Sequence, residues 1–457
     1  MAVMQKPRLH HDWIDSHAYG IVKALQKGGF TTYLVGGCVR DLLLGIHPKD
    51  FDIATAAHPP QVKRLIYMSF IIGKRFRLVL VKREDQQFEV ATFRREVKAE
   101  EFPEGVPAGD NVFGSPEEDA QRRDFTVNGL FYDPVNDQLI DYVDGIADIQ
   151  ARILRMIGDP DVRLVEDSIR ILRGLRLAHK LGLTIESNLR AAMGRNAATL
   201  AASALPRRRE EILKILRLDE PELVLMECFD LGILEHVIPT LHGFISDPVR
   251  RENFLQHFVM YRDIVADSSD TTQLFGWLVY SMLQAALTGP SERTEPVTID
   301  DEPFQRMMRD ELGMFKYEQS ALMKSIELVP YLNKTDEFKR RGERRQLALM
   351  KNEGFKLGLR FAEVDLQITA SQLAFWKSAA GRMSGELAEI SEANKGKKRR
   401  RPRRKRGAPR DAAAGATAND ETGADLIEGG SEEIDSEIDE ADLSIEAQLA
   451  LASDDER

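Results

Sequence analysis

Two hydrophobic periods alternate along the first third of the chain. Apolar residues at helical spacing predict a helix over 16–30, opened by a Ser cap and closed by a glycine pair. The chain then changes to short β-type runs separated by helical pieces, the runs at 31–37, 51–55, 71–81 and 88–93 and the helical pieces at 39–45 and 59–68. A helix-like segment at 119–133 precedes a last strand at 139–145. This alternation predicts a mixed α and β unit.

The pattern changes to helix alone beyond Ile149. Apolar residues spaced three and four apart predict helices over 167–183, 203–218 and 221–241. A polar stretch at 288–303 predicts a loop inside this helical part, because helical patterns flank it. The acid-, Gly- and Pro-rich segment 95–118 predicts a mobile loop.

Composition then divides the chain. From about Glu392 the aromatic residues vanish and the sequence becomes Ala, Gly and charge, which predicts disorder. We therefore expect a mixed α and β unit at 1–150, a helical part at 151–391 and a disordered tail at 392–457.

Length and composition exclude several classes of protein. The 457 residues correspond to about three folded units. No apolar run approaches the length of about 18 residues that a membrane span requires. The only cysteines, Cys38 and Cys228, are too few for a disulfide framework or a structural zinc site. The first residues lack the pattern of a signal peptide. These features predict a cytoplasmic protein without a membrane partner.

The net charge of −11 conceals two opposed blocks in the tail. Residues 395–410 carry 11 Lys or Arg and no acid, whereas residues 411–457 carry 16 acids and one Arg. A flexible run of cations attracts any RNA backbone, so the basic block predicts an RNA partner. A basic linker without a binding function is the alternative. The acidic block either screens the basic one or contacts a protein, and the sequence does not decide between these roles.

Two aspartates at the start of the run 51–55 offer metal chemistry. Asp50 and Asp52 lie two apart, so on a strand their carboxylates point the same way. Mg²⁺ accepts one or two protein carboxylates and completes its shell with water and phosphate oxygens. A D-x-D pair is by itself more often a turn or a solvated strand end.

A second feature lies thirteen residues upstream, where an apolar run ends at Gly36 and Gly37 and a helix begins near Cys38. Such a turn presents free backbone N–H groups to a phosphate, and Arg40 lies one turn into the helix. The alternative is a tight turn in which Arg40 pairs with Asp41 or Asp50. We interpret Cys38 as a packing residue.

Two further polar segments are ambiguous when taken singly. RRDFTVN, at 122–128, supplies two cations, a carboxylate and short polar groups, or it is an ordinary helix start with an ion pair. The segment 166–176 spaces Asp167, Arg170, Arg173 and Arg176 by threes, so the arginines lie close together along a helix. An Asp and an Arg one turn apart can present acceptor and donor edges to a nucleobase, and a salt-bridged helix is the alternative.

Taken in order, these segments carry a family resemblance. YLVGGCVRDLLLG, PKDFDIAT, FEVATFR, EEDAQRRDFTVNGL, DYVDGIADI and EDSIRILRGLRLAHKLGL resemble the class II nucleotidyltransferases, which comprise the tRNA CCA-adding enzymes and bacterial poly(A) polymerase. The match covers about 33–215. The resemblance implies an α+β fold, with a polymerase-β-like head containing a mixed sheet at 1–150, then all-helical neck and body domains at 151–235 and 236–391.

The resemblance also assigns roles to residues. It implies that Asp50 and Asp52 bind Mg²⁺ and are catalytic together with Asp124. It places Gly36, Gly37, Arg40 and Arg123 at nucleotide-binding positions. Asp167 and Arg170, with Arg173 beside them, match the pair that recognises the incoming base. Glu89 is a further carboxylate that can approach the metals, or it pairs with Arg77 or Arg94.

The poly(A) polymerase branch is favoured by two segments outside these motifs. IIGKRFRLVLV, at 71–81, is similar to a G-R-R-F-R-L stretch of that branch, although Lys74 and Leu80 depart from the pattern. The basic block resembles the Arg-rich tail of the same branch. We therefore expect AMP transfer from ATP to RNA 3′-ends, with RNA-degradation or RNA-chaperone proteins as partners through the tail. A CCA-adding enzyme and an inactive RNA-binding protein on a transferase fold are the alternatives.

A metal-dependent phosphohydrolase site is poorly supported. His11 and Asp12 form an isolated pair, and no second cluster in the sequence completes such a site.

Overall fold

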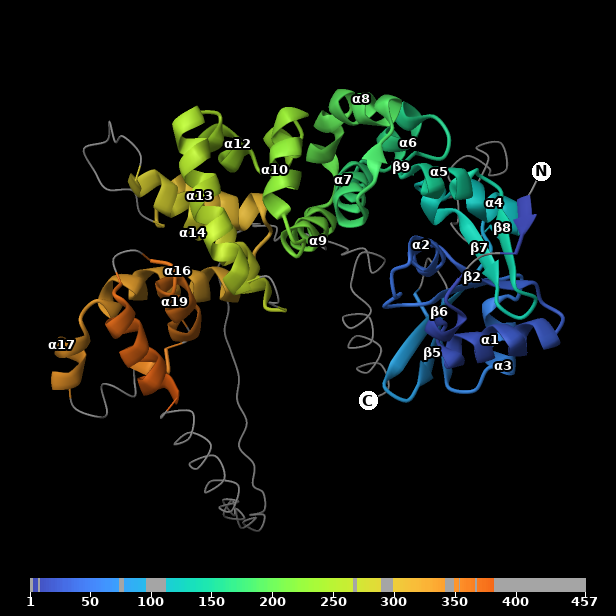
Figure 1. Ribbon diagram of the computed structural model, residues 1–457, viewed down its shortest axis with the longest axis horizontal. Helices are drawn as coiled ribbons and strands as arrows, with labels where there is room; N and C mark the ends of the chain where they lie inside the picture. Colours follow the sequence, from blue (N-terminus) through green and yellow to red (C-terminus); the bar gives the residue numbers. More distant parts are fainter. Residues whose placement is uncertain are drawn as a thin grey trace, which may run out of the picture.

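A sheet-containing head occupies one end of the molecule, and helices extend away from it (Figure 1). This computed structural model describes residues 3–6, 9–73, 78–95, 112–265, 269–288, 299–341, 349–352, 354–365 and 368–381. The predictions for the basic and acidic blocks, and most of those for the loops 95–118 and 288–303, lie outside the described residues.

The head contains one mixed sheet of eight strands, in the order β1-β8-β7-β2-β3-β6-β5-β4. The strands are β1 (Val3–Gln5), β2 (Thr32–Val35), β3 (Asp52–Thr55), β4 (Ser69–Ile72), β5 (Leu78–Arg83), β6 (Gln86–Thr92), β7 (Leu130–Asp133) and β8 (Gln138–Asp141). Within this sheet β3 and β6 run parallel, and the other neighbouring strands are antiparallel. The predicted runs over 31–37, 51–55, 88–93 and 139–145 are confirmed, and the run 71–81 contains parts of β4 and β5.

Apolar side chains fix which face of the sheet the helices cover. Val79, Val81 and Val90 belong to the same buried cluster as residues of α1 (Ser16–Lys27) and α3 (Pro59–Leu65). Because strand side chains alternate, Leu78, Glu89 and Ala91 point to the opposite face, where they line a cleft. The predicted first helix is confirmed, but its cap is Asp15, whose carboxylate accepts the His17 and Ala18 N–H groups. The predicted Ser cap is therefore wrong by one residue.

The segment 119–133 is mostly not helical, which corrects the prediction. Helix α4 (Pro116–Gln121) ends early, a 3₁₀ turn covers Thr126–Asn128, and the apolar residues that follow form β7. The reason is tertiary, since Leu130, Phe131 and Tyr132 are fully buried within the sheet. Helix α5 (Gly145–Ala151) then leads out of the head.

Beyond Ile149 the elements of the described residues are helical except for one short parallel ladder between β9 (Ile153–Leu154) and β10 (Thr184–Ile185). The expectation of helix alone therefore missed two strands of two residues each. Helices α6 (Pro160–Glu166), α7 (Ile169–Leu181), α8 (Ser187–Arg195) and α9 (Leu205–Leu216) follow the head. Figure 1 shows α7 lying nearer the head than α9 does.

The remaining helices extend to the far end of the molecule (Figure 1). Among them are α10 (Pro221–Asp230), α11 (Leu234–Val237), α12 (Pro239–Ile245), α13 (Pro248–Val265), α14 (Thr271–Thr288), α15 (Glu302–Arg306), α16 (Lys316–Leu332), α17 (Thr335–Arg340) and α19 (Phe355–Ala362). Stacked Phe258 and Trp277 rings, 4.1 Å between centroids, join α13 to α14. The boundaries between the four predicted domains stay a prediction.

Head and helices share one apolar core. Phe125, next to the 3₁₀ turn, packs against Gly174 in the middle of α7, where an added Cβ would lie 3.1 Å from the Phe125 ring. The same buried cluster continues through α9 to Phe275 and Leu322. This packing holds α7 beside the sheet. Within the described residues, no helix is long and apolar enough to cross a membrane.

Candidate active site

A cleft of about 610 Å³ lies between the head sheet and α7. Its walls carry glycines, carboxylates and cations, among them Gly36, Gly37, Arg40, Asp52, Glu89, Arg123, Asp124, Asn128, Asp167, Arg170, Arg173, Arg176 and Lys180. Nine of the ten site residues predicted from the sequence are therefore brought to one place. Asp50 is the exception, because it lines a neighbouring hollow instead.

The glycine pair forms the turn between β2 and α2 (Gly37–Leu44) as predicted. Gly36 has φ +71° and ψ −128°, a conformation that residues with a Cβ rarely adopt. A Cβ added there would lie 2.9 Å from Arg123 Nη1 and 4.0 Å from Asp52 Oδ2. The missing side chain thus lets the backbone at the start of α2 approach both a cation and a carboxylate.

Asp52 is the first residue of β3, opposite Val35 at the end of β2. Asp50 precedes the strand, so the alternation rule that predicted a shared direction for the two carboxylates applies only to Asp52. Asp50 is nonetheless close enough for its charge to act on both Asp52 and Glu89. Glu89 projects from β6 into the cleft, which Arg94 also lines, and Arg77, its other expected partner, lies outside the described residues.

Three negative charges gather here against their own repulsion. The surrounding protein withdraws water from Asp52 and raises the pKa of its carboxyl, while Arg123 opposes this rise and Asp50 adds to it. Burial, Asp52 and Asp50 together raise the pKa of Glu89. Such a donor set is electrostatically incomplete without a cation, and hard carboxylate oxygens are what Mg²⁺ prefers.

Asp52 is therefore a suitable ligand for the expected metal. Asp50 and Glu89 lie close enough to Asp52 for their carboxylates to interact with it electrostatically. In the part of the chain that the structure describes, no group of three or more His, Cys, Asp or Glu side chains is placed to hold an ion. The fit rests on few protein ligands, with the remaining ligands supplied by water and substrate oxygens, as is usual for Mg²⁺.

Two predicted cations on the sheet side are already held by carboxylates. Arg40 is buried and donates to Asp41 Oδ1 at 2.6 and 2.8 Å and to Asn128 Oδ1 at 2.6 Å. The pairing of Arg40 with Asp41 is the alternative that the sequence left open. Arg123 donates to Asp119 Oδ2 at 3.0 Å and lies over the Phe131 ring, 5.3 Å from its centroid. These contacts fix both guanidinium groups at the wall of the cleft.

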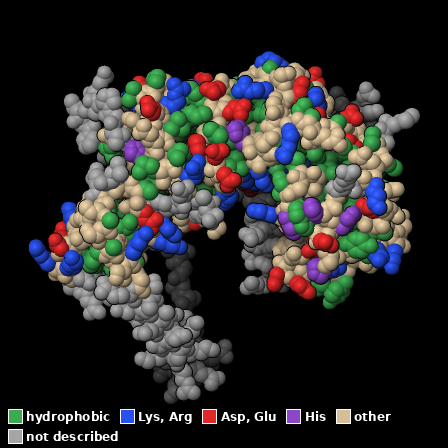
Figure 2. All heavy atoms as spheres, in the orientation of Figure 1, with side chains coloured by type: hydrophobic (Ala, Val, Ile, Leu, Met, Phe, Trp, Pro, Cys, Tyr) green, Lys and Arg blue, Asp and Glu red, His purple; other side chains and the backbone are tan. Residues whose placement is uncertain are grey.

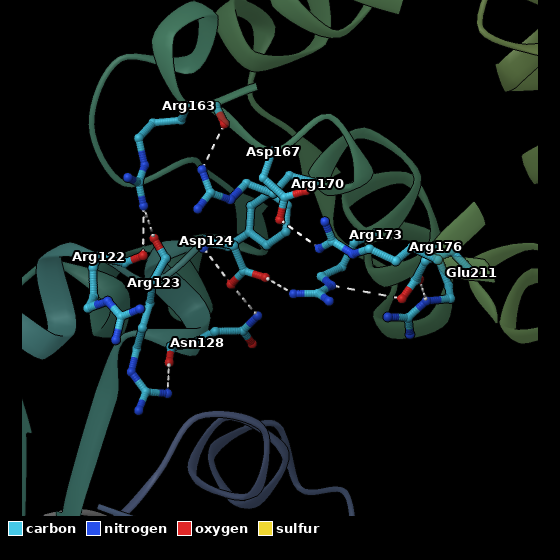
Figure 3. Close-up of polar contacts among 12 residues, drawn as sticks. Arg122, Arg123, Asp124, Asn128, Arg163, Asp167, Arg170, Arg173, Arg176 and Glu211 are labelled. Carbon is cyan, nitrogen blue, oxygen red and sulfur yellow. Dashed lines mark hydrogen bonds and ion pairs between the residues drawn. The ribbon is translucent and has the colours of Figure 1, made fainter. Parts of the chain in front are cut away.

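Asp124 is held by contacts that use both of its carboxylate oxygens (Figure 3). Oδ1 accepts from the Phe125 N–H at 2.8 Å and the Asn128 amide at 3.0 Å, and Oδ2 accepts from Arg173 at 3.2 Å. Burial alone would raise the pKa of Asp124, but Arg173 and the two hydrogen bonds outweigh it and lower the pKa. The carboxylate is therefore ionised, and it orients Arg173 and Asn128.

The predicted base-reading pair does not lie on one continuous helix. Helix α6 ends at Glu166, Asp167 has an extended backbone with φ −147°, and α7 begins at Ile169. Asp167 accepts from Arg207 of α9 at 3.0 Å, and Arg170 donates to the Arg163 carbonyl at 2.7 Å and to Glu166 at 3.2 Å. Both side chains nevertheless line the cleft together.

Sequence reasoning missed three polar residues of this site. Glu211 of α9 is 2% exposed and accepts from Arg176 at 2.7 Å, so it supports the arginine row from outside the quoted motifs. Asp119 holds Arg123, and Lys180 lies one turn beyond Arg176. For Glu211 the only available signal was its position beside Ile212 and Ile215 on the apolar stripe of α9. Cys38 is buried and donates to the Val35 carbonyl at 3.2 Å, as expected of a packing residue.

Known proteins share both halves of this arrangement. A family model described as the poly(A) polymerase head domain matches residues 32–155, and one described as a probable RNA and SrmB-binding site of polymerase A matches residues 182–245. Poly(A) polymerase I of Haemophilus influenzae is 38% identical over 253 residues, which cover 53% of this chain and 55% of that protein. The CCA-adding enzyme of Lactiplantibacillus plantarum is 39% identical over 203 residues, 44% of this chain and 49% of that protein.

A solved structure shows the same fold over a longer stretch. The CCA-adding enzyme of Bacillus stearothermophilus in complex with CTP matches with a TM-score of 0.58 at 24% identity, covering 81% of this chain and 82% of that one. The head, with its mixed sheet, has the fold of this solved structure. The chain is similar to the class II nucleotidyltransferases over the head and the helices that follow it. It spans about half the length of the curated relatives it matches.

Proposed function

We propose that this protein is a template-independent poly(A) polymerase that transfers AMP from ATP to the 3′-hydroxyl of RNA and releases pyrophosphate. The observation that carries the proposal is the cleft, which collects a glycine turn, several carboxylates and a row of arginines between head and α7. The 38% identity to a poly(A) polymerase I over half the chain supports the choice of reaction.

The residues divide the work of the reaction. We assign the triphosphate to the turn at Gly36 and Gly37, where backbone N–H groups at the helix start and the Arg123 guanidinium face one region. Asp50 and Asp52 would hold Mg²⁺, which supplies charge neutralisation at the reacting phosphate and lowers the pKa of the attacking hydroxyl. Asp124 keeps Arg173 in position beside the substrate.

Nucleotide choice falls to Asp167 and Arg170. A carboxylate accepts from a base amino group and a guanidinium donates to ring nitrogens or carbonyls, so the pair can read a base edge without a template. Arg207 fixes Asp167, and Glu166 fixes Arg170. Their present partners orient the pair for the incoming base.

CCA addition is the second candidate, since a CCA-adding enzyme matches at 39% identity and the solved relative binds CTP. We favour poly(A) synthesis because of the 71–81 stretch and the basic block at 395–410. Residues 74–77 and the basic block lie outside the described residues, so this preference rests on sequence. An inactive RNA-binding protein is disfavoured, because Asp50, Asp52 and Asp124 are all present.

RNA is the expected macromolecular partner, and the family model at 182–245 adds a protein partner of the SrmB type to the proposal. The tail remains the expected site of other protein contacts. The cytoplasmic location stays a prediction, and it accords with two cysteines that are buried and free.

One assay tests the reaction directly. The purified full-length chain receives a 5′-labelled RNA ending in A or in CC, with Mg²⁺ and either ATP or CTP. Long A tails on both RNAs support the proposal. Ordered addition of C and then A that stops after CCA would instead establish the second candidate. An Asp52→Asn variant serves as the inactive control for contaminating polymerase.

A further inference from the structure

Four cations follow one another along the face of α7 that borders the cleft. Arg170, Arg173, Arg176 and Lys180 are spaced three or four residues apart, and Figure 3 shows the three arginines in a row. Each arginine is paired with a carboxylate, namely Glu166, Asp124 or Glu211. Lys180 has no hydrogen bond or ion pair to any residue that the structure describes.

Cations rather than acids dominate the surroundings of Lys180. The charges that act on its ammonium group are those of Asp41, Arg40, Arg176 and Lys49. Asp41 Oδ1 already accepts two hydrogen bonds from Arg40, so its negative charge is shared. Partial burial lowers the pKa of Lys180, and the three neighbouring cations lower it further against the opposing effect of Asp41. In this corner of the cleft, cations therefore outnumber carboxylates among the charges that act on Lys180.

Lys49 extends the corner to the far side of the D-x-D segment. It directly precedes Asp50, and the two residues line a hollow of about 700 Å³ next to the cleft. Lys180 lines the cleft itself, together with Asp52. Each lysine thus shares a hollow with one of the candidate metal-binding carboxylates, and the charge of Lys49 acts on Lys180. Figure 2 shows Lys and Arg side chains on the walls of the recess between the head and the helical part.

The direction of α7 indicates which substrate reaches this corner. Lys180 follows Arg170 by ten positions, which corresponds to about 15 Å along the axis of the helix. With the base of the incoming nucleotide at Arg170, Lys180 lies at the other end of this row, near Arg40 and Asp41 of α2 and thus on the side of the cleft where the glycine turn receives the phosphates. The acceptor strand must reach the reacting phosphate from a side that the nucleotide leaves open.

We propose that Lys180 and Lys49 bind backbone phosphates next to the 3′-end of the acceptor RNA. This inference rests on the proposed function, whichever nucleotide the enzyme adds. Lysine suits the role because its ammonium group is a compact point charge that binds a phosphate without needing a fixed planar geometry. Asp50 lines the same hollow as Lys49, and its carboxylate repels a phosphate. Lys49 therefore binds a phosphate only from the side turned away from Asp50.

The test is a set of short RNA acceptors that each carry one uncharged methylphosphonate linkage, at successive positions from the 3′-end. We expect one linkage among the last few at which neutralisation lowers kcat/KM for the wild-type chain by about threefold to tenfold. Lys180→Ala should lower kcat/KM for the normal RNA by a similar factor. In this variant, neutralising that linkage should cause no further loss of kcat/KM. Lys49→Ala should behave in the same way at the same or the adjacent linkage.

Two variants make the result specific. Lys180→Arg keeps the positive charge and should retain most of the sensitivity to that linkage. Lys63→Ala removes an exposed lysine from α3, which covers the opposite face of the sheet, and should match the wild type throughout. The inference is overturned if the loss of kcat/KM in Lys180→Ala simply adds to the loss caused by each neutral linkage. It is also overturned if Lys180→Ala raises KM for ATP without changing KM for RNA.

The same acceptors also distinguish this inference from the proposed function. RNA binding, measured by fluorescence anisotropy without nucleotide, needs no turnover. If the wild-type chain shows no linkage at which neutralisation weakens binding, the proposed lysine site is wrong, even if the chain makes long A tails. If the chain adds no nucleotide but Lys180→Ala still removes the effect of one linkage, the site stands and the reaction assignment falls.

Discussion

Arg173 in α7 donates a hydrogen bond to the buried carboxylate of Asp124, 3.2 Å away, and so links the helical part of the chain to the head. Asp124→Asn and Arg173→Met should each lower the free energy of unfolding by about 1–3 kcal/mol, because each leaves a partner without its counter-charge. Arg173 is 37% exposed, which keeps the loss below that of a fully buried pair. Urea unfolding of both single variants and the double variant measures the coupling. A double variant that loses the full sum of the two would show that the contact carries no energy of its own.

Asp52→Asn should reduce nucleotide addition by about 10³-fold or more, since an amide cannot hold the metal that stabilises several kcal/mol of developing charge. The side chain is similar in size, so the fold and RNA binding should persist. Single-turnover incorporation and filter binding, run on the same preparation, separate the two effects. Near-normal AMP incorporation would rule out this carboxylate as a metal ligand.

The raised pKa values of Asp52 and Glu89 give a stability test that needs no activity. Both carboxyls have a higher pKa in the folded than in the unfolded chain, so their ionised forms disfavour folding at neutral pH. As the pH falls through these raised values, protonation removes that cost. In the absence of divalent ions, Asp52→Asn should therefore be more stable than the wild type at pH 7, and the difference should shrink towards pH 4.

Mg²⁺ should reverse the order. At ten times its dissociation constant a bound ion stabilises the wild type by about 1.4 kcal/mol, and Asp52→Asn should gain much less. Thermal unfolding with and without Mg²⁺ at pH 5 and pH 7 measures both effects. Equal stabilisation of the two chains by Mg²⁺ would remove the ion from this site.

Gly36→Ala should raise KM for ATP strongly, because the added Cβ would approach Arg123 Nη1 to 2.9 Å and the backbone at φ +71°, ψ −128° disfavours any side chain. Gly45→Ala is the matched control. Gly45 also has a positive φ, of +73°, but nothing lies within 4 Å of its added Cβ. It should cost about 1 kcal/mol of stability without changing KM for ATP. Equal effects of the two substitutions on KM would show that strain, and not the position of Arg123, matters.

The sequence predicted the site better than it predicted the elements that build it. The glycine turn was predictable because it needs only a strand, two glycines and a helix in succession, which are local features. The segment 119–133 was not, because Leu130, Phe131 and Tyr132 also fit a helical spacing and become a strand only through pairing with β2 and β8. Tertiary packing overrode the local pattern there.

The partners of the site residues were hidden for a related reason. Asp124 and Arg173 are 49 positions apart, and Arg40 reaches Asn128 across 88 positions. Charge and spacing show which side chains can pair, but only the packing of Phe125 against Gly174 decides that they do. The D-x-D rule failed for Asp50 because the strand begins at Asp52, two residues after Asp50.

Arg207 offers a test of how the base is chosen, since its guanidinium donates to Asp167 at 3.0 Å. Asp167→Ala removes an acceptor for the base edge and should lower the ratio of kcat/KM for ATP over CTP by about tenfold or more. Arg207→Ala leaves Asp167 in place but unsupported, so the ratio should fall in the same direction by a smaller factor. Arg195→Ala, which breaks an exposed pair with Asp161, should leave the ratio unchanged. Competition between the two nucleotides in one reaction measures the ratio directly, and an unaltered ratio in Asp167→Ala would place base selection elsewhere in the cleft.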